Sequence, residues 1–469
     1  MTVTRRPSSF GAGLRSTLVP GWGQLATNQR VIGKALVFFS GLMAIACLTV
    51  FLFVEPLAIT AWLVDPDVLL ALILFNLMLA VIRLFSTGHA WLVGGGHRWF
   101  AALVLAGIVA IPHVAIGWVG METRDSLMKV FPTSTPIAAA PTTTTSPSTT
   151  STTTTLDIDL SPIVTAPGQF AEDVIEVADA APWQPFGEER LNILLLGGDA
   201  GPGRSGLRTD TMIVASIDPL TGDAALFGLP RNFGGVAFTD GTPVPVSILN
   251  AVYGYGRRIP EAFGGIDPGA SAVRDVIQNI TGLQIDYFML VDLTGFADLV
   301  DAFGGVSVNV AEPVDGPLYD KATGGYEMVH IEAGRQKLDG GHALAYARAR
   351  YGSTDYVRMG RQRCILASMA AEADLLTLMG RISDLLTVVE TNLVTDLPVG
   401  LVPELIRLTP RISAGEIRLV GFDPTWRAGR TATGYAIPDV ERIREAVRQT
   451  IEDPSAAAAL GVTTAGEGC

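Results

Sequence analysis

The sequence is poor in cysteine, histidine and lysine. Three of the 469 residues are cysteines, and because Cys47 lies in an apolar run and Cys469 ends the chain, no disulfide framework is predicted. Five are histidines, and His330 and His342 fall in segments of strand and helical character, so a histidine-based mechanism has little support. Only four are lysines, so arginine supplies most of the positive charge.

A surplus of basic residues is also missing. The formal net charge is -13. Residues 1–130 hold nine Lys/Arg and five Asp/Glu, a net charge of +4, whereas the remainder holds 24 basic and 41 acidic residues, a net charge of -17. Basic residues dominate the surface of a protein that binds nucleic acid, so this balance argues against a nucleic-acid partner.

Long apolar runs are present in the first 120 residues. A helix of about 20 residues spans a bilayer, and three runs reach that length: 34–54, 68–86 and 100–120. They predict an all-α membrane region of three transmembrane helices over residues 34–120. Residues 1–33 precede it as a cytoplasmic N-terminus that includes an interfacial turn, "LVPGWGQL" (18–25).

The charged residues between the runs predict the orientation of the chain. Arginines precede the first run (Arg5, Arg6, Arg15 and Arg30), and two more lie at the end of the second run and after it (Arg83 and Arg98). The stretch between the first and second runs has no Lys or Arg and contains only acidic charges: Glu55, Asp65 and Asp67. Basic residues collect on the cytoplasmic side. We therefore expect a multi-pass protein of the cell membrane with a cytoplasmic N-terminus and an extracytoplasmic domain after residue 120.

A linker separates the membrane region from a globular pattern. Residues 121–186 include "PTTTTSPSTTSTTTT" (141–155), whose composition cannot build a core. A domain is predicted over residues 187–455, followed by a flexible C-terminal tail over 456–469.

Strand and helix patterns alternate within the predicted domain, which is typical of a layered α/β architecture. Strands are predicted at 191–198, 211–218, 223–230, 284–293 and 306–310. Helices are predicted at 269–282, 294–305, 338–350, 356–376 and 439–453.

Arginines concentrate in "ALAYARARYGSTDYVRMGRQR" (343–363), which contains five of them and no lysine. In a helix over 356–376, Arg358, Arg361 and Gln362 share one face. Asp355 would stand at the N-terminal edge of that helix, and Arg363 would point away from the shared face.

The two arginines before that helix are two positions apart. Arg348 and Arg350 cannot share a helical face, but an extended segment lets both point the same way. Further polar residues follow or precede predicted strands, namely Asp199, Arg208, Asp210 and Arg231. Ligands of α/β sheets bind at strand ends, so these residues are candidates for the same site.

The residue types indicate a phosphate ligand. The planar fork of arginine grips phosphate oxygens, and two carboxylates such as Asp199 and Asp210 can hold Mg²⁺ together with phosphates. The alternative for each arginine is a solvated side chain paired with a neighbouring carboxylate.

Several segments occur in an order that resembles a known family. They are "NILLLGGD", "RTDTMIVASIDPLTG", "GLPRN", "LNAVYGYG", "TGLQIDYFMLVDLTGFADLVDAFGGVSVNV", "GRQKLDGGHALAYARAR" and "DYVRMGRQR". Residues 191–363 thus resemble the LytR-CpsA-Psr family of cell-wall glycopolymer ligases. The resemblance implies a central mixed sheet sandwiched by helices, with an apolar pocket for a polyprenyl chain. It also implies transfer of a glycopolymer from a polyprenyl diphosphate carrier onto peptidoglycan through a phosphodiester bond.

The resemblance also implies roles for residues. Asp199 and Asp210 would hold Mg²⁺ or Mn²⁺, and one of the two would take the proton of the attacking hydroxyl; which one is left open. The diphosphate would be bound by five arginines and a glutamine: Arg208, Arg231, Arg348, Arg350, Arg361 and Gln362. Of these, Arg348 and Arg350 would be catalytic residues, together with Asp199 and Asp210. Asp355 and Arg358 would shape the substrate-binding site.

Two positions depart from the family pattern. Asn232 stands where the family usually has aspartate, and Ile248 stands where it usually has lysine. They are the support for one alternative function, a non-catalytic lipid-diphosphate-binding regulator of wall assembly. A second alternative is a polyprenyl-diphosphate hydrolase, in which water replaces the glycan hydroxyl as nucleophile.

Overall fold

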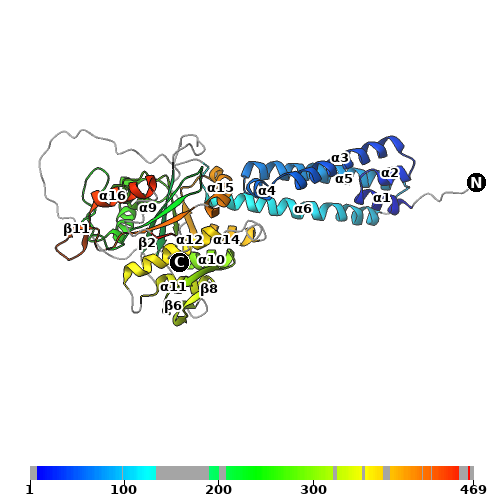
Figure 1. Cartoon of the computed structure of the whole chain (residues 1–469). Coiled ribbons are helices and arrows are strands. Elements are labelled where there is room, and N and C mark those ends of the chain that lie inside the picture. Colours follow the sequence, from blue (N-terminus) through cyan, green and yellow to red (C-terminus); the bar gives the residue numbers. More distant parts are fainter. Residues whose placement is uncertain are drawn as a thin grey trace, which may run out of the picture. The chain divides into compact units, whose positions relative to one another are not determined.

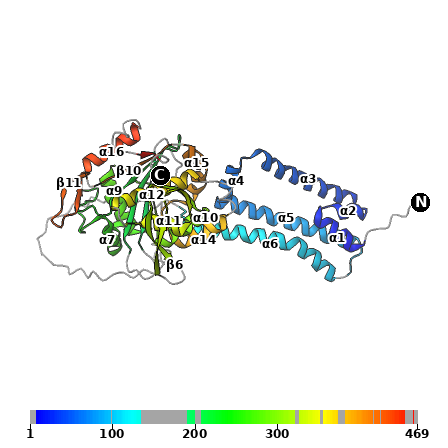
Figure 2. The same cartoon turned by 60° about the horizontal axis from the view of Figure 1, so that its bottom comes forward.

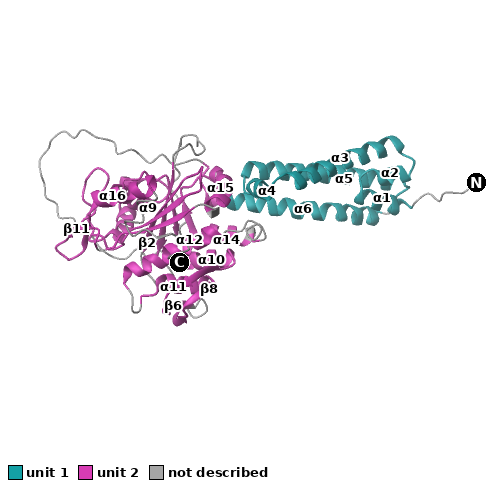
Figure 3. Cartoon of the chain, in the orientation of Figure 1, with its two compact units in different colours: residues 1–128 teal, residues 129–469 magenta. Residues whose placement is uncertain are grey.

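The computed structural model describes residues 8–97, 99–133, 190–199, 207–320, 325–350, 354–372, 381–414, 416–423, 425–453 and 463–464. The chain divides into two compact units, residues 1–128 and 129–469 (Figure 3). Figure 1 shows the elements of both units in chain order.

The first unit is helical. Its helices are α1 (Ser9–Leu18), α2 (Trp22–Ala26), α3 (Arg30–Phe53), α4 (Pro56–Leu63), α5 (Pro66–Val93) and α6 (Trp99–Val130). Among the described residues, α3, α5 and α6 are long and apolar enough to cross a membrane, and they lie side by side (Figure 2). The three predicted transmembrane helices are therefore confirmed as helices of membrane-spanning length.

The observed helices are longer than the apolar runs that predicted them. The helix α6 continues through polar residues to Val130, so residues 121–130 extend a helix where the sequence predicted the start of the linker. Intrahelical hydrogen bonding does not end where apolar composition ends, so composition alone misplaces such a boundary. Most of the predicted linker, including its Thr-rich part, lies outside the described residues.

The segment expected to be an interfacial turn is packed into the first unit. Gln24 is fully buried; its Oε1 accepts a hydrogen bond from Ser16 at 2.8 Å, and its Nε2 donates to the Ser86 carbonyl of α5 at 2.7 Å. Gly23 lies so close to α1 that an added Cβ would come within 2.0 Å of the Ala12 carbonyl oxygen. The "PGWGQ" residues thus join α1 and α2 to α5 through hydrogen bonds and close packing.

The second unit is built on a seven-stranded mixed sheet in the order β13-β10-β3-β2-β1-β4-β9. The strands are β1 (Leu191–Gly198), β2 (Thr209–Ile217), β3 (Ala224–Gly228), β4 (Tyr287–Val291), β9 (Leu393–Thr395), β10 (Ile417–Gly421) and β13 (Thr463–Thr464). The pairs β1/β4 and β3/β10 are parallel, whereas β2 pairs antiparallel with both β1 and β3. The carboxyl ends of β1, β3, β4 and β10 therefore meet at one edge of the sheet.

Helices cover both faces of this sheet. On one face, Val214 and Phe227 join a core cluster with residues of α9 (Pro268–Thr281) and α16 (Val440–Glu452). The helix α12 (Asp355–Glu372) contacts β2, β3 and β10, and its Arg363 lies against Gly228, the neighbour of Phe227. Successive strand residues point to opposite faces, so α12 covers the other face. The predicted central mixed sheet sandwiched by helices is confirmed.

The remaining elements of the second unit surround this core. Three two-stranded sheets pair β5 (Val306–Val310) with β8 (Gly334–Leu338), β6 (Val314–Asp320) with β7 (Gly325–Ile331), and β11 (Arg427–Arg430) with β12 (Ala436–Pro438). The other helices are η2 (Leu249–Ala251), α7 (Val252–Arg258), α8 (Pro260–Phe263), α10 (Leu293–Ala302), α11 (Gly340–Arg348), α14 (Ile382–Asn392), η3 (Val399–Leu401) and α15 (Val402–Ala414).

Two features of the second unit differ from the sequence predictions. Cys364, in α12, is disulfide-bonded, a bond that the small number of cysteines did not predict; Cys47 is a free cysteine. In addition, Thr463 and Thr464 lie in the segment expected to be a flexible tail, yet they pair with β10 as strand β13.

Candidate functional site

The two predicted metal-binding aspartates lie at the adjoining ends of β1 and β2. Asp199 follows β1, and its Oδ1 accepts a hydrogen bond from the Arg208 backbone N–H at 2.8 Å. Gly197 pairs with Thr211 and Gly198 with Thr209, so Asp210 is the extra residue of a β-bulge in β2. A bulge changes the direction of a side chain. Here the bulged residue is Asp210, whose side chain contacts the loop that follows β3.

Arg231, which follows β3, connects two carboxylates of the site. Its Nη1 lies 2.6 Å from Oδ2 of Asp210, and its Nε lies 3.3 Å from Oδ2 of Asp355. Burial by itself raises the pKa of Asp210, but the hydrogen bond and charge of Arg231 outweigh it, so that the pKa lies below its usual value. Asp210 is therefore ionised at neutral pH.

Asp355, the first residue of α12, contacts three arginines. Besides Arg231, it pairs with Arg358 Nη2 at 3.2 Å and with Arg350 Nη2 at 3.5 Å. The side chain of Arg350 is 49% exposed, whereas that of Arg358 is only 4% exposed. Asp355 thus holds arginines from three separate segments next to one another.

Arg358 is a buried cation of the site. Its Nη2 donates to the Asp210 carbonyl oxygen at 3.3 Å, and its Nε is buried without a hydrogen-bond partner among the described residues. Burial lowers the pKa of Arg358 to about 10, so the guanidinium still carries its charge at neutral pH. Asp210, Arg231, Asp355 and Arg358 form one connected network.

Arg361 and Gln362 connect α12 to the end of α11. Arg361 donates to the Ala349 carbonyl oxygen at 2.9 Å, and Gln362 donates to the Ala347 carbonyl oxygen at 3.4 Å. Both contact the same short segment of the chain. The guanidinium of Arg361 also lies 5.4 Å from the centre of the Tyr346 ring.

Arg348 and Arg350 meet different partners. Arg348 is the last residue of α11, and its guanidinium lies 4.8 Å from the centre of the Tyr326 ring. Its Nη1 is buried without a hydrogen-bond partner in the described part of the chain. Arg350 pairs with Asp355 instead, so the two arginines have different contacts, and their common orientation stays a prediction.

The sequence did not single out Asn250, which the structure adds to the site. Asn250 is buried, and its Nδ2 donates to Oδ1 of Asp210 at 3.1 Å. It belongs to "LNAVYGYG", so the segment was noted but the residue was given no role. Because Asn250 and Arg231 each contact one oxygen of Asp210, the orientation of that carboxylate is fixed.

The two departures from the family pattern lie on neighbouring segments. The backbone N–H groups of Leu249 and Asn250 donate to the carbonyl oxygens of Phe233 and Arg231, at 2.7 and 3.0 Å. Asn232 hydrogen-bonds Tyr356 of α12, and Ile248 is half-buried. Asn232 thus contacts Tyr356, the residue that follows Asp355, and Asn232 itself carries no charge.

The site as a whole carries positive charge. Its ten predicted residues include six arginines and three aspartates, and the side chain of Arg208 is exposed beside Asp199. Among the described residues, no group of three or more His, Cys, Asp or Glu side chains is placed to hold a metal ion. An arrangement with this excess of guanidinium groups favours an anionic ligand.

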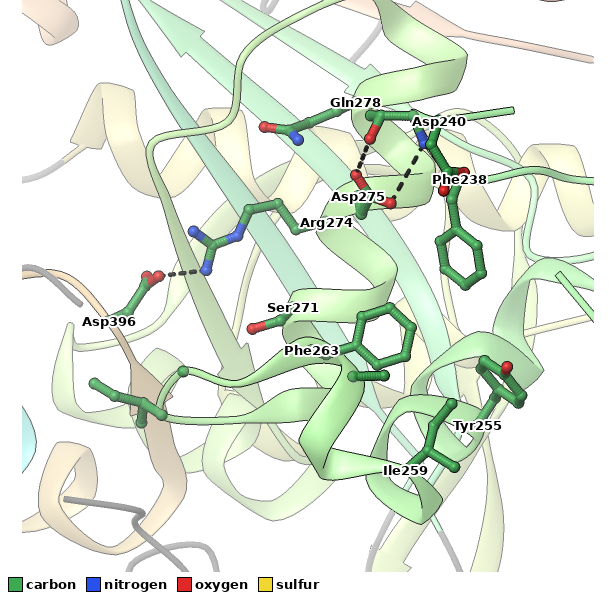
Figure 4. A pocket seen from close by; sticks show the side chains of 14 residues that line it. Phe238, Asp240, Tyr255, Ile259, Phe263, Ser271, Arg274, Asp275, Gln278 and Asp396 are labelled. Carbon is green, nitrogen blue, oxygen red and sulfur yellow. Dashed lines mark hydrogen bonds and ion pairs between the residues drawn. The ribbon is translucent and has the colours of Figure 1, made fainter. Parts of the chain in front are cut away.

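A separate cavity of about 330 Å³ lies beside α9 (Figure 4). Its lining includes the rings of Phe238, Tyr255 and Phe263 and the ion pair of Arg274 with Asp396. None of the residues predicted for the arginine site lines this cavity, so it is distinct from that site.

The fold and the site define an α/β protein in which arginines and aspartates meet at one edge of a mixed sheet. A family model described as the LytR_cpsA_psr family matches residues 172–442. The chain therefore belongs to the LytR-CpsA-Psr family, and the resemblance seen in the sequence is confirmed.

The chain is also similar to named bacterial proteins. It is 29% identical over 219 residues to "Polyisoprenyl-teichoic acid--peptidoglycan teichoic acid transferase TagU" of Enterococcus faecalis, covering 45% of this chain and 62% of the relative. It is 32% identical over 191 residues to "Probable cell wall biosynthesis protein LcpB" of Corynebacterium glutamicum, covering 40% of this chain and 39% of the relative. The chain thus spans less than two thirds of the length of these relatives.

Solved structures are similar as well. Protein gbs0355 of Streptococcus agalactiae gives a TM-score of 0.44 at 24% identity, covering 56% of this chain and 88% of that chain. TagV of B. subtilis gives a TM-score of 0.42 at 24% identity, covering 57% of this chain and 99% of that chain.

Proposed function

We propose that this protein is a Mg²⁺-dependent phosphotransferase that moves a glycopolymer from a polyprenyl diphosphate carrier onto peptidoglycan. The observation that carries the proposal is the network of Asp210, Arg231, Asp355 and Arg358 at the carboxyl edge of the sheet, in a member of the LytR-CpsA-Psr family. The name of the E. faecalis relative, which describes transfer of teichoic acid from a polyisoprenyl carrier to peptidoglycan, supports the same reaction.

The arginines would bind the diphosphate of the donor. Arg231, Arg348, Arg350 and Arg361 come from different elements, and Asp355 holds two of them. Arginine forks match phosphate oxygens in geometry and charge. Arg208, which is exposed at the start of β2, would complete the set, and Gln362 would donate from the same face of α12 as Arg361.

Asp199 and Asp210 fit a magnesium ion that takes its other ligands from phosphate and water. A carboxylate has about four acceptor positions, and the hydrogen bonds to Asn250 and Arg231 leave acceptor positions on each oxygen of Asp210. Bound Mg²⁺, or Mn²⁺ in its place, would neutralise charge on the diphosphate. The lowered pKa of Asp210 suits metal binding.

One of the two carboxylates, Asp199 or Asp210, would take the proton of the acceptor hydroxyl. The hydroxyl oxygen of the peptidoglycan acceptor would attack the phosphorus next to the glycopolymer while its proton passes to that carboxylate. The bond from that phosphorus to the bridging oxygen would break, and polyprenyl monophosphate would leave. The buried guanidinium of Arg358 would keep Asp355 and Asp210 in position, because it contacts both.

The same proposal places residues after 120 outside the cell membrane. The three helices of spanning length and the arginine-rich flanks on one side support a multi-pass anchor with a cytoplasmic N-terminus. Protease added to intact, wall-stripped cells is expected to cut within the Thr-rich residues 141–155 and to release the domain. Immunoblotting with an antibody to the domain measures this. A domain that is protected in intact cells and cut only after lysis contradicts the orientation.

The function itself is tested by the products of the purified full-length protein in detergent. With a prenyl-diphosphate-linked saccharide and peptidoglycan fragments, we expect an adduct in which one phosphorus joins the saccharide to the glycan, found by mass spectrometry. Free saccharide phosphate as the sole product would favour the hydrolase. The neutral residues Asn232 and Ile248 are the observation that favours a non-catalytic regulator, and donor binding without any product would support it.

A further inference from the structure

Arg363 of α12 lies away from the arginines of the connected network, against the sheet. A Cβ added to Gly228 would come within 2.5 Å of its Nη1, and a Cβ added to Gly421 within 2.5 Å of its Nη2. Gly228 and Gly421 are paired across the parallel strands β3 and β10, and each is the last residue of its strand. The guanidinium therefore lies over two neighbouring strand ends, in space that only glycines leave open.

This guanidinium has no counter-charge in the described part of the chain. Its Nε and Nη1 are buried without a hydrogen-bond partner there. Arg358 and Arg361, on the same helix, pair with Asp355 and with the Ala349 carbonyl oxygen. Buried cations in proteins are normally paired, so a cation that is unpaired among the described residues has the capacity to bind an anionic ligand.

Burial lowers the pKa of Arg363 to about 10, so the side chain remains a cation at neutral pH. The residue as a whole is half-buried, which leaves part of the side chain within reach of a ligand. Its position agrees with ligand binding, because ligands of α/β sheets lie outside the carboxyl ends of the strands.

The position also adjoins the diphosphate site. Arg231 follows Gly228 by three residues, which is at most about 11 Å along the chain. The Leu229 backbone N–H donates to the Met212 carbonyl oxygen at 2.9 Å, so the chain between Gly228 and Arg231 is held to β2. A ligand with two or more phosphate groups could contact both arginines.

We propose that Arg363 forms a second anion subsite, which binds a phosphate-class oxyanion of the substrate at the ends of β3 and β10. The proposal rests on the function proposed above. It adds to that function a ligand-binding residue that lies between α12 and the sheet. The oxyanion belongs either to the donor diphosphate or to a phosphodiester of the glycopolymer, because both present the same oxygens to a guanidinium.

The test is calorimetric titration of the purified full-length protein in detergent with inorganic pyrophosphate, geranyl diphosphate and a glycerol phosphate oligomer. The variants are Arg363→Met, which keeps the length of the side chain without its charge, and Arg363→Gln. The matched control is Arg448→Met in α16, where the wild-type side chain is 54% exposed and paired with Glu445 and Glu452.

Arg363→Met is expected to weaken pyrophosphate binding by about 10-fold or more and to raise the thermal midpoint of the ligand-free protein, because an unpaired buried charge is removed. Arg448→Met should change the affinity less than twofold. A loss seen with pyrophosphate and geranyl diphosphate assigns the subsite to the donor, whereas a loss seen with the glycerol phosphate oligomer alone assigns it to the polymer.

Affinities within twofold of wild type for all three probes, in both Arg363 variants, would overturn the inference and leave the proposed function standing. A wild-type protein that binds none of the probes would contradict both. A raised thermal midpoint with unchanged affinities would show that Arg363 is a structural residue only.

Discussion

Replacement of Asp210 by asparagine is expected to lower the rate of transfer by on the order of 100-fold or more, while the fold survives. Removal of one group that stabilises charge in a transition state commonly costs about 100- to 1,000-fold. The amide keeps the size of the side chain and can still accept from Asn250, but it loses the charge that faces Arg231 and the proposed metal. Titration of Mg²⁺ in the presence of geranyl diphosphate should show weaker metal binding.

The same variant has a signature in the pH dependence of stability. Because the pKa of Asp210 is lower in the folded protein than in the unfolded chain, its carboxylate stabilises the fold above about pH 4. That stabilisation is lost as the pH falls through the folded pKa. Thermal midpoints of wild type and Asp210→Asn should therefore differ at pH 7 and converge at low pH.

Asp240→Asn is the matched control for the rate and for the Mg²⁺ titration, because Asp240 is an exposed carboxylate in a turn, where it accepts from the Thr242 backbone N–H. It should leave the rate and the Mg²⁺ affinity unchanged. Equal Mg²⁺ affinity in wild type and Asp210→Asn would remove Asp210 from the metal site, and an unchanged rate would remove it from the reaction.

Arg348→Ala and Arg361→Ala are each expected to weaken diphosphate binding by about 10- to 100-fold, because a hydrogen bond to a charged group contributes about 1.5–3 kcal/mol. Arg348 has a buried Nη1 with no partner among the described residues, so the ligand would satisfy it. Lysine at either position should not restore the affinity, because a lysine has no planar fork. Titration with geranyl diphosphate measures the affinity of the two alanine variants and the two lysine variants.

Arg407→Ala provides the comparison, because Arg407 is 40% exposed on α15 and pairs with Glu404. It should bind geranyl diphosphate as wild type does. If the lysine variants bind as tightly as wild type, the fork geometry is unimportant and the arginines act only through their charge.

The regular elements that carry the site could be predicted because their patterns are local. The strand over 191–198 and the helix that begins near 356 are observed as β1 and as α12, Asp355–Glu372. The helical spacing predicted that Arg358, Arg361 and Gln362 share one face, and two of them, Arg361 and Gln362, contact one segment at Ala349 and Ala347. Such contacts depend on the helical repeat, which the sequence records directly.

Contacts between distant segments could not be predicted in this way. The bulge at Asp210 depends on the register of β1 against β2, and the burial of Arg363 depends on glycines in two other strands. Helical spacing correctly predicted that Arg363 points away from the face that carries Arg358 and Arg361. It could not tell a solvent-exposed side chain from one that lies against the sheet, so Arg363 was not expected to matter for the ligand.

In the membrane region, too, local patterns could be predicted and contacts between distant segments could not. Apolar runs predicted the three long helices because transfer into a bilayer depends on composition. They did not predict the hydrogen bonds of Gln24 with Ser16 and with Ser86, the latter across 62 residues of sequence. The turn predicted for this Gly-Pro-rich stretch is observed at residues 19–21, and the stretch also packs as part of the helical unit.

In the proposed reaction a carbohydrate hydroxyl, and not water, accepts the phosphoryl group. This is tested by the fate of oxygen when the purified full-length protein acts on a prenyl-diphosphate-linked saccharide and peptidoglycan fragments in water enriched in ¹⁸O. We expect a phosphodiester adduct without ¹⁸O, together with unlabelled prenyl monophosphate. Saccharide phosphate or prenyl phosphate that carries ¹⁸O, with no adduct, would contradict it and identify a hydrolase.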